Sequence, residues 1–184
     1  MLIAFTGGAR SGKSAAALRA ATSDGAPVTF IATAEAGDDE MAARIERHRA
    51  DRPAAWTTIE APIHLALAVE QVDAEATIVI DCLSMWVSNR MLEGGAGAGS
   101  VDAAHAGEIT AEARELVACL HGREGVSIVV TNEVGSGVVP ATPLGRAYRD
   151  VLGSVNQIVV GAADRAYLVV AGKRLELSGP EGGA

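Results

Sequence analysis

The stretch that decides the fold of this chain is Gly7-Gly8-Ala9-Arg10-Ser11-Gly12-Lys13-Ser14. It matches the phosphate-binding pattern G-x-x-x-x-G-K-[ST] at every fixed position. In this pattern the glycines let the backbone curl until its N–H groups point at phosphate oxygens, and the lysine adds a charge for the outer phosphates. The chain has two lysines, Lys13 and Lys173, and one of them fills the required position. We predict that residues 7–14 bind the phosphates of a nucleotide and that Ser14 holds Mg²⁺, with a glycine turn that binds nothing as the alternative.

The residues on both sides of this motif have the context that a phosphate-binding loop requires. An apolar stretch from Leu2 to Phe5 predicts a short strand that leads into the loop, and Ala15 to Ala21 predict a helix after it. The N-terminus of a helix favours anions, because its free N–H groups and its dipole face them. Strand, loop and helix therefore support the same nucleotide site.

Strands and helices are predicted to alternate along the rest of the chain. Runs rich in β-branched and aromatic residues predict strands at 28–33, 56–60, 77–81, 126–131, 166–171 and, at an edge, 173–177. Apolar periodicity and capping residues predict helices at 38–51, 62–72, 101–120 and 142–161. Within the second of these helices, Leu65, Leu67 and Val69 are predicted to face the sheet. This alternation predicts an α/β fold of the P-loop NTPase type, a doubly wound and mainly parallel sheet with helices on both faces.

Composition favours one catalytic domain over residues 1–184. The chain has 184 residues, of which 49% are hydrophobic, so one well-buried core is expected. We expect residues 93–100, with four glycines, to be a flexible linker and residues 178–184 to be a frayed tail. A net charge of −8 argues against a nucleic-acid partner, which would need a basic face.

The sequence contains no recognisable targeting or membrane segment. Met1 is followed at once by the predicted strand and loop, without the charged and apolar regions of a secretory leader. No apolar run reaches the roughly 18 residues of a membrane span, so we expect a cytoplasmic protein. Cys82 and Cys119 form no spaced cluster and are expected to be buried thiols without a disulfide or a metal.

Asp81 follows four strand-forming residues, Thr77 to Ile80. Open α/β sheets bind their ligands at the carboxyl ends of their strands, so this carboxylate is predicted to emerge beside the nucleotide. We predict that Asp81 and Ser14 are the Mg²⁺ ligands. The alternative is an acid that caps the following helix.

His48 is the second candidate for chemistry. Met41, Ile45 and His48 recur at helical spacing on one inward face, and arginines surround the histidine at positions 44, 47, 49 and 52. A neutral imidazole can attack phosphorus and so divide one difficult transfer into two easier ones. The alternative is a half-buried structural histidine, with arginines that complement the helix C-terminus.

Other histidines and the two tryptophans receive simpler interpretations. We expect His64, His105 and His121 to be structural or solvated. Trp56 and Trp86 are expected in the core, with stacking on a base or on a substrate group as the alternative.

These motifs together resemble one known family, the bifunctional adenosylcobinamide kinase/adenosylcobinamide-phosphate guanylyltransferases of cobalamin biosynthesis. The resemblance extends from end to end and includes features that general P-loop kinases do not share. It rests on Thr6 to Ser14, Ile31 to Ala34, Asp38 to Ile45, His48-Arg49, Arg52-Pro53, Trp56, Thr58, Glu60, Thr131 to Gly135, Gly137, Pro140, Arg149-Asp150 and Asn156-Gln157.

The resemblance implies a kinase step and a guanylyl transfer, with His48 attacking the α-phosphorus of GTP and Lys13 as the second catalytic residue. It implies adenosylcobinamide and its phosphate as substrates, GTP as the nucleotide with ATP as an alternative donor for the kinase step, Mg²⁺ as cofactor, and a homotrimer. The implied nucleotide contacts are Gly7, Gly8, Ala9, Arg10, Ser11, Gly12, Lys13, Ser14, Thr33, Ala34, Glu35, Arg49, Ala50, Asp51, Arg52, Glu60 and Asp81. Two rival functions remain at this point, a small-molecule kinase with a structural His48 and a nucleotide-dependent switch or binding module.

Overall fold

The computed structural model of the chain describes residues 1–23, 25–50, 52–93 and 102–177. Most of the predicted glycine-rich linker, the predicted tail and the predicted nucleotide contact Asp51 lie outside these residues. One seven-stranded sheet runs through the molecule in the order β3-β2-β4-β5-β1-β6-β7. Its strands are β1 (Leu2–Thr6), β2 (Val28–Ala32), β3 (Thr57–Glu60), β4 (Thr77–Asp81), β5 (Ser127–Val130), β6 (Arg165–Val170) and β7 (Lys173–Leu177).

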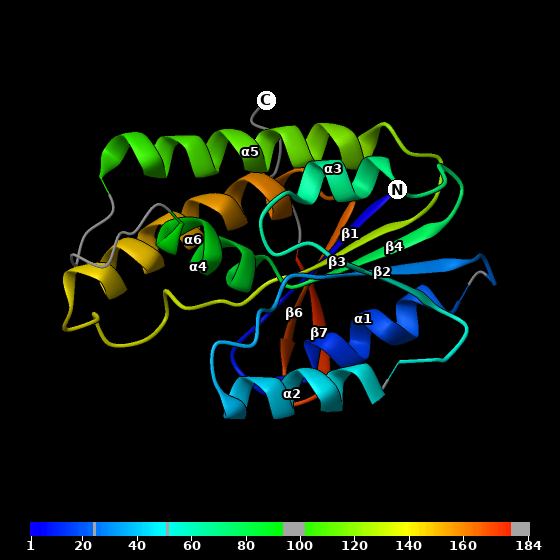
Figure 1. Ribbon diagram of the computed structural model, residues 1–184, viewed down its shortest axis with the longest axis horizontal. Coiled ribbons are helices and arrows are strands. Elements are labelled where there is room, and N and C mark those ends of the chain that lie inside the picture. Colours follow the sequence, from blue (N-terminus) through cyan, green and yellow to red (C-terminus); the bar gives the residue numbers. More distant parts are fainter. Residues whose placement is uncertain (24, 51, 94–101, 178–184) are drawn as a thin grey trace.

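Helices cover both faces of this sheet. The described helices are α1 (Lys13–Ala21), α2 (Asp39–Ala50), α3 (Leu65–Glu70), α4 (Leu83–Leu92), α5 (Ala103–His121) and α6 (Pro143–Gly161). Figure 1 shows α1 and α2 on one side of the sheet and the other four helices on the opposite side. Every strand pairing in the sheet is parallel except that of β6 with β7. The doubly wound, mainly parallel architecture is the one that the sequence predicts.

Strand order brings the predicted site residues to one edge of the sheet. β5 lies between β1, which leads into the phosphate-binding motif, and β4, which ends at Asp81. Ala32 at the end of β2 is in register with Asp81 on one side and with Glu60 on the other. Because these strands are parallel, their carboxyl ends all open toward the same space.

The sheet separates two hydrophobic cores. Alternating strand residues, such as Ile3 and Phe5, pack with α1, whereas Leu2 and the other alternate residues pack with α3 to α6. Strands covered on both faces read as continuous apolar runs, which is why the central strands could be found from sequence.

The helix predicted at 62–72 is shorter in the structure, and one of its predicted contacts is wrong. Leu65 and Val69 are buried as expected, but Leu67 is 56% exposed, and Ala68 takes the buried position. The prediction grouped residues two apart, whereas one face of a helix repeats every three or four residues.

Helix α4 follows Asp81, where a helix was considered from the sequence but given no bounds. Its buried residues Leu83, Trp86, Val87 and Met91 do fall at helical spacing, so a periodic signal was present. The indole N–H of Trp86 donates to the carbonyl of Ile63 at 2.7 Å, and the ring is 1% exposed. Trp86 is therefore a core residue, as the simpler interpretation held.

His105 and His121 form structural contacts. The Nε2 of His105 lies 2.7 Å from the carbonyl oxygen of Arg90, and its Nδ1 lies 3.2 Å from Glu108. The hydrogen bond to the Arg90 carbonyl, helped by Glu108, raises the pKa of His105. The Nε2 of His121 lies 3.0 Å from the carbonyl of Ala162.

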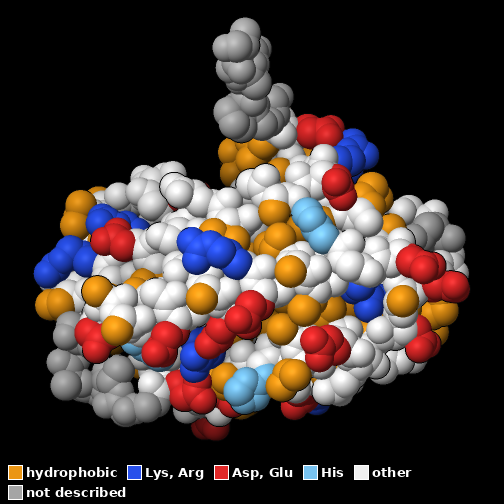
Figure 2. Space-filling model, turned by 90° about the horizontal axis from the view of Figure 1, so that it is seen from above, with side chains coloured by type: hydrophobic (Ala, Val, Ile, Leu, Met, Phe, Trp, Pro, Cys, Tyr) orange, Lys and Arg blue, Asp and Glu red, His pale blue; other side chains and the backbone are white. Residues whose placement is uncertain are grey.

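The face on which α5 lies carries a mixture of side-chain types. Figure 2 shows the side on which α5 lies, where acidic, basic and hydrophobic side chains are interspersed. No helix within the described part of the chain is long and apolar enough to cross a membrane. Cys82 and Cys119 are both free thiols.

Candidate functional site

The phosphate-binding motif forms a closed loop between β1 and α1. Gly7 has a φ of +152°, and a Cβ there would lie 2.3 Å from the carbonyl oxygen of Val169, so a side chain cannot be accommodated. Gly12 caps α1 with a φ of +94°, in the left-handed region that favours glycine. The ammonium group of Lys13 donates to the carbonyl of Gly8 at 3.1 Å. The lysine therefore reaches back across the loop, where it can meet the outer phosphates of a nucleotide.

Helix α2 presents its apolar stripe to a cavity. The carboxylate of Asp38 accepts a hydrogen bond from the backbone N–H of Met41 at 2.7 Å and so caps the helix. Met41, Ile45 and His48 all line one cavity of about 140 Å³, and Met41 and Ile45 belong to neither of the two cores formed by the described residues. The inward face that the sequence predicts is confirmed, but it faces a cavity instead of the sheet.

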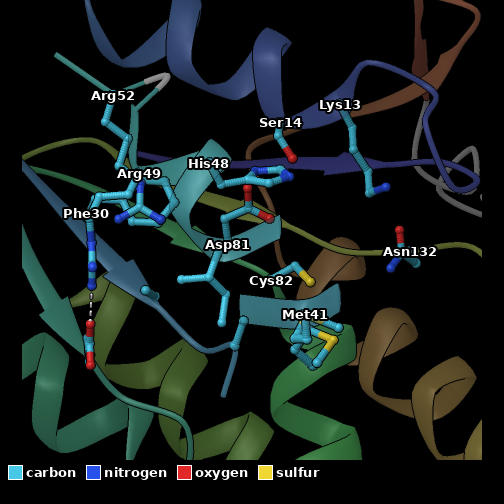
Figure 3. A pocket seen from close by; sticks show the side chains of 15 residues that line it. Lys13, Ser14, Phe30, Met41, His48, Arg49, Arg52, Asp81, Cys82 and Asn132 are labelled. Carbon is cyan, nitrogen blue, oxygen red and sulfur yellow. Dashed lines mark hydrogen bonds and ion pairs between the residues drawn. The ribbon is translucent and has the colours of Figure 1, made fainter. Parts of the chain in front are cut away.

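Two hollows meet at His48. The cavity of about 140 Å³ lies over the strand ends, and a more open hollow of about 620 Å³ lies along residues 9–15 and α2. Lys13, Ser14 and His48 line both hollows, while Arg47 lines the second. In Figure 3 the His48 ring lies beside Ser14 and Asp81 in the middle of the view. The imidazole therefore stands where the phosphate-binding loop opens into the cavity.

An ion pair forms one side of the cavity. The guanidinium of Arg49 donates to Glu60 at 2.6 Å, the dashed line in Figure 3, and to Glu46 at 2.7 Å. Arg49 comes from α2 and Glu60 from the end of β3, so the pair holds the helix against the sheet edge. Both partners of the pair are exposed, so its contribution to stability is small, and its main effect is to hold the Arg49 guanidinium at the cavity wall.

A second arginine lies deeper on the same side. The guanidinium carbon of Arg52 lies 3.6 Å from the centre of the Phe30 ring, a cation–π contact. Burial lowers the pKa of Arg52, and the nearby carboxylate of Asp81 opposes this effect. Its Nε is buried without a hydrogen-bond partner among the described residues. A cation held in this way suits the binding of an anion or of an aromatic base.

Asp81 lies on the wall of the same cavity as Lys13 and Ser14. The hydrogen bonds found among the described residues do not include the Asp81 carboxylate, and the N-cap of α4 is Cys82, whose side chain makes no capping bond. The alternative of a helix-capping acid therefore has no support. A carboxylate and a hydroxyl are oxygen ligands of the kind that Mg²⁺ takes together with substrate phosphates and water. The described residues contain no cluster of three or more His, Cys, Asp or Glu side chains for a metal, so phosphates and water would complete its coordination.

The structure brings together most, but not all, of the predicted contacts. Thr33 is fully buried and bonded to Cys82, and the side chains of Glu35 and Ala50 are exposed and away from the cavity lining. Predicted residues that line the cavity are Lys13, Ser14, Ala34, His48, Arg49, Arg52, Glu60 and Asp81. Ala9, Arg10, Ser11 and Gly12 line the neighbouring hollow.

Several residues that line the cavity were not predicted from the sequence to belong to the site. Phe30, Cys82, Met85 and Asn132 line the cavity. Burial, together with the charge of Asp81, raises the pKa of the Cys82 thiol, so this cysteine stays protonated. Cys82 directly follows β4 and Asn132 lies two residues after the end of β5, and these positions near strand ends were the available signal.

Comparison with known proteins identifies the family of the chain. Residues 3–177 match the family model of cobinamide kinase / cobinamide phosphate guanyltransferase. The chain belongs to this family. It is 40% identical over 174 residues to the bifunctional adenosylcobalamin biosynthesis protein CobP of Pseudomonas aeruginosa, covering 94% of this chain and 95% of that one. It is 41% identical over 179 residues to the bifunctional adenosylcobalamin biosynthesis protein CobU of Salmonella typhimurium, covering 94% of this chain and 97% of that one.

Among solved structures, an ATPase from the type III secretion system of pathogenic bacteria matches with a TM-score of 0.59 at 11% identity. The match covers 91% of this chain and 50% of that one, and at this identity it shows the fold alone. The predicted fold class and the predicted family are both confirmed, and family membership makes the chain an enzyme.

Proposed function

We propose that this enzyme phosphorylates the hydroxyl group of the aminopropanol arm of adenosylcobinamide and then transfers GMP from GTP to that phosphate, through a covalent guanylyl group on His48. The product is adenosylcobinamide-GDP. Membership of the cobinamide kinase / cobinamide phosphate guanyltransferase family supports both halves of the proposal. The observation that carries the histidine step is the position of His48 on the wall that the two hollows share.

This position suits an attack on the α-phosphorus. The loop from Gly7 to Ser14 is suited to the outer phosphates, with Lys13 supplying the charge. A triphosphate that runs from the loop into the cavity would pass His48 before it reaches Arg49 and Arg52. The phosphorus nearest the imidazole would then be the one next to the nucleoside.

The transfer proceeds in two displacements. A lone pair on the neutral imidazole of His48 forms a bond to the α-phosphorus, and the bond to the α,β-bridging oxygen breaks, so that pyrophosphate leaves with the electron pair. The phosphate oxygen of adenosylcobinamide phosphate then attacks the same phosphorus, and the nitrogen–phosphorus bond breaks. The imidazole recovers its electron pair and the enzyme is ready for another cycle.

The kinase step uses the same loop and the other end of the phosphate chain. We propose GTP as the donor, with ATP as an alternative, because the phosphate contacts do not depend on the base. Ser14 and Asp81 would hold Mg²⁺, which neutralises charge on the phosphates as the transferred group separates. Lys13 would stabilise the same charge from the loop.

The first rival function, a small-molecule kinase, treats His48 as structural. The hydrogen bonds of the described residues do not include the His48 side chain, whereas His105 and His121 are each bonded to a backbone carbonyl. The position of His48 on the wall of both hollows, where its ring can reach a phosphate, supports the nucleophile.

GTP labelled at different phosphates separates the three functions. With α-³²P-GTP and Mg²⁺, the proposed enzyme leaves label on the protein and then passes it to adenosylcobinamide phosphate. A small-molecule kinase with a structural His48 passes on label from γ-³²P-GTP alone, and a switch releases GDP without labelling either protein or corrinoid. The second or third result would overturn the guanylyl-histidine step.

We also propose that the enzyme assembles as a homotrimer, as the family resemblance implies. Val138 and Val139, between β5 and α6, are 96% and 62% exposed, and Leu175 on β7 is 63% exposed. Apolar side chains at such exposure are available for contacts between subunits. Light scattering should give a mass near three chains, and a monomer at micromolar concentration would contradict this part of the proposal.

A further inference from the structure

Asn132 lies at the phosphate end of the cavity. It follows β5, which runs between the strand leading to Lys13 and the strand ending at Asp81, and all three side chains line the cavity. In Figure 3, Lys13 and Asn132 lie on one side of the view and Arg49 on the other, with His48 between them. Asn132 is therefore on the side of the outer phosphates, away from the arginines.

Hydrogen bonds hold Asn132 in place. Its Nδ2 donates to the hydroxyl of Ser84 at 2.6 Å, and its backbone carbonyl accepts from the Nδ2 of Asn156 at 2.9 Å. Ser84 is held in turn by the phenol of Tyr148, which donates to its carbonyl at 3.1 Å, and by the thiol of Cys82 at 2.9 Å. Burial raises the pKa of Tyr148 to about 12, so it remains a donor at neutral pH. This network uses the amide nitrogen of Asn132 and leaves its oxygen for another partner.

The Oδ1 of Asn132 is buried and has no hydrogen-bond partner among the described residues. Buried acceptors are nearly always paired, so an exception at a cavity wall points to a ligand that supplies the donor. Phosphate oxygens cannot fill this role, because they are acceptors too. The hydroxyl group that receives the phosphoryl group is a donor, and it must approach the outer phosphate, which Lys13 is suited to bind.

We propose that Asn132 binds the hydroxyl of the phosphoryl acceptor through Oδ1 and that Ser84 is the positioning residue that orients the amide. The inference rests on the kinase half of the proposed function. The hydroxyl oxygen forms a bond to the γ-phosphorus, and the bond to the β,γ-bridging oxygen breaks, leaving its electron pair on the nucleoside diphosphate. An amide oxygen is too weak a base to remove the hydroxyl proton, so the proton passes to water once the new bond has formed. Asn132 orients the hydroxyl and does not titrate.

The test compares Asn132→Ala, Ser84→Ala and the double variant in phosphorylation of adenosylcobinamide with γ-³²P-GTP. GTP affinity and labelling of the protein by α-³²P-GTP are measured on the same preparations. Loss of orientation should lower kcat/KM for adenosylcobinamide by about 30- to 100-fold in Asn132→Ala. Ser84→Ala should lower kcat/KM for adenosylcobinamide by roughly 5- to 10-fold. The double variant should have a kcat/KM no lower than that of Asn132→Ala, because both residues act through one amide. GTP affinity and protein labelling should stay within about 3-fold, and the shape of the pH profile should not change.

Two results would overturn the inference while leaving the proposed function intact. One is phosphorylation by Asn132→Ala at the wild-type rate, and the other is an equal loss in phosphorylation, GTP affinity and protein labelling. If Asn132→Ala does not fold, Asn132→Ser takes its place, because its shorter hydroxyl does not reach the position of Oδ1 and the same loss is expected. Failure of the unmodified enzyme to phosphorylate adenosylcobinamide would overturn the kinase half of the proposed function and this inference with it.

Discussion

The hydroxyl of Thr33 accepts a hydrogen bond from the backbone N–H of Cys82 at 2.9 Å and donates one to the carbonyl of the same residue at 2.7 Å. The backbone N–H of Thr33 also donates to the carbonyl of Asp81 at 3.4 Å. One buried side chain thus ties the end of β2 to the end of β4. This tie fixes the positions of Ala34 and Asp81 on the cavity wall.

The main effect of Thr33→Val should therefore be a loss of stability. The substitution leaves the N–H and the carbonyl of Cys82 without their partner in the interior, which should lower the free energy of unfolding by about 1–3 kcal/mol. Urea denaturation measures the loss, and Thr33→Ser, which keeps the hydroxyl, should stay within about 1 kcal/mol of wild type. A variant as stable as wild type that has lost GTP binding would instead make Thr33 a nucleotide contact.

Lys13→Ala should abolish both activities with the fold intact. The lysine is the charged side chain of the phosphate-binding loop, and loss of such a preorganised charge costs on the order of 10²- to 10³-fold in rate. Lys173→Ala is the matched control, because Lys173 is the second lysine of the chain and is exposed on β7. Near wild-type turnover of Lys13→Ala in either reaction would show that the phosphates bind elsewhere.

Asp81→Asn should raise the Mg²⁺ concentration needed for nucleotide binding. An amide keeps the shape of the side chain but removes the charge that attracts the cation. The control is Glu75→Gln, an exposed acid just before the opposite end of β4. Titration of GTP binding against Mg²⁺ checks the prediction, and an unchanged requirement would remove Asp81 from the metal site.

His105 should make stability depend on pH. Its folded-state pKa is raised, so its contribution is complete below the unfolded value of about 6.5 and is lost as pH rises through the folded value. Only the protonated ring can donate to both the Arg90 carbonyl and Glu108. The loss of stability in His105→Ala should thus be larger near pH 5.5 than near pH 8.5. Glu108→Gln should reduce this difference, and an equal loss at both pH values would contradict the assignment.

Local patterns predicted the sheet and the phosphate-binding loop well, for a physical reason. Parallel strands covered on both faces are continuous apolar runs, and a loop that cradles phosphates needs glycine at fixed positions. Asp81 could be predicted because a carboxylate directly after a buried strand must emerge at the ligand edge. The stripe of Met41, Ile45 and His48 was read correctly as inward, although periodicity cannot distinguish a core from a cavity.

What could not be predicted depends on pairs that are distant in sequence. The tie of Thr33 joins residues 49 positions apart, and no local pattern marks a threonine that is used in this way. The contact between Arg49 and Glu60, and that of the Asn132 amide with Ser84, likewise can be predicted only when the strand order is known. The bounds of helix α4 were not predicted because Ser84, Asn89 and Arg90 interrupt its apolar residues, and these polar side chains prove to be bonded to other elements.

The most direct test of the account is the covalent state of His48 after incubation with α-³²P-GTP and Mg²⁺. Wild type, and a His121→Ala control that removes a structural histidine, should each gain a single GMP by intact-protein mass and carry the label. His48→Ala should carry none, because the guanidinium groups of the neighbouring Arg47 and Arg49 have no lone pair to offer phosphorus. The wild-type label should be labile in acid and stable in alkali, as expected of a phosphoramidate. Labelling of His48→Ala, or an acid-stable label on wild type, would contradict the assignment of His48 as the nucleophile.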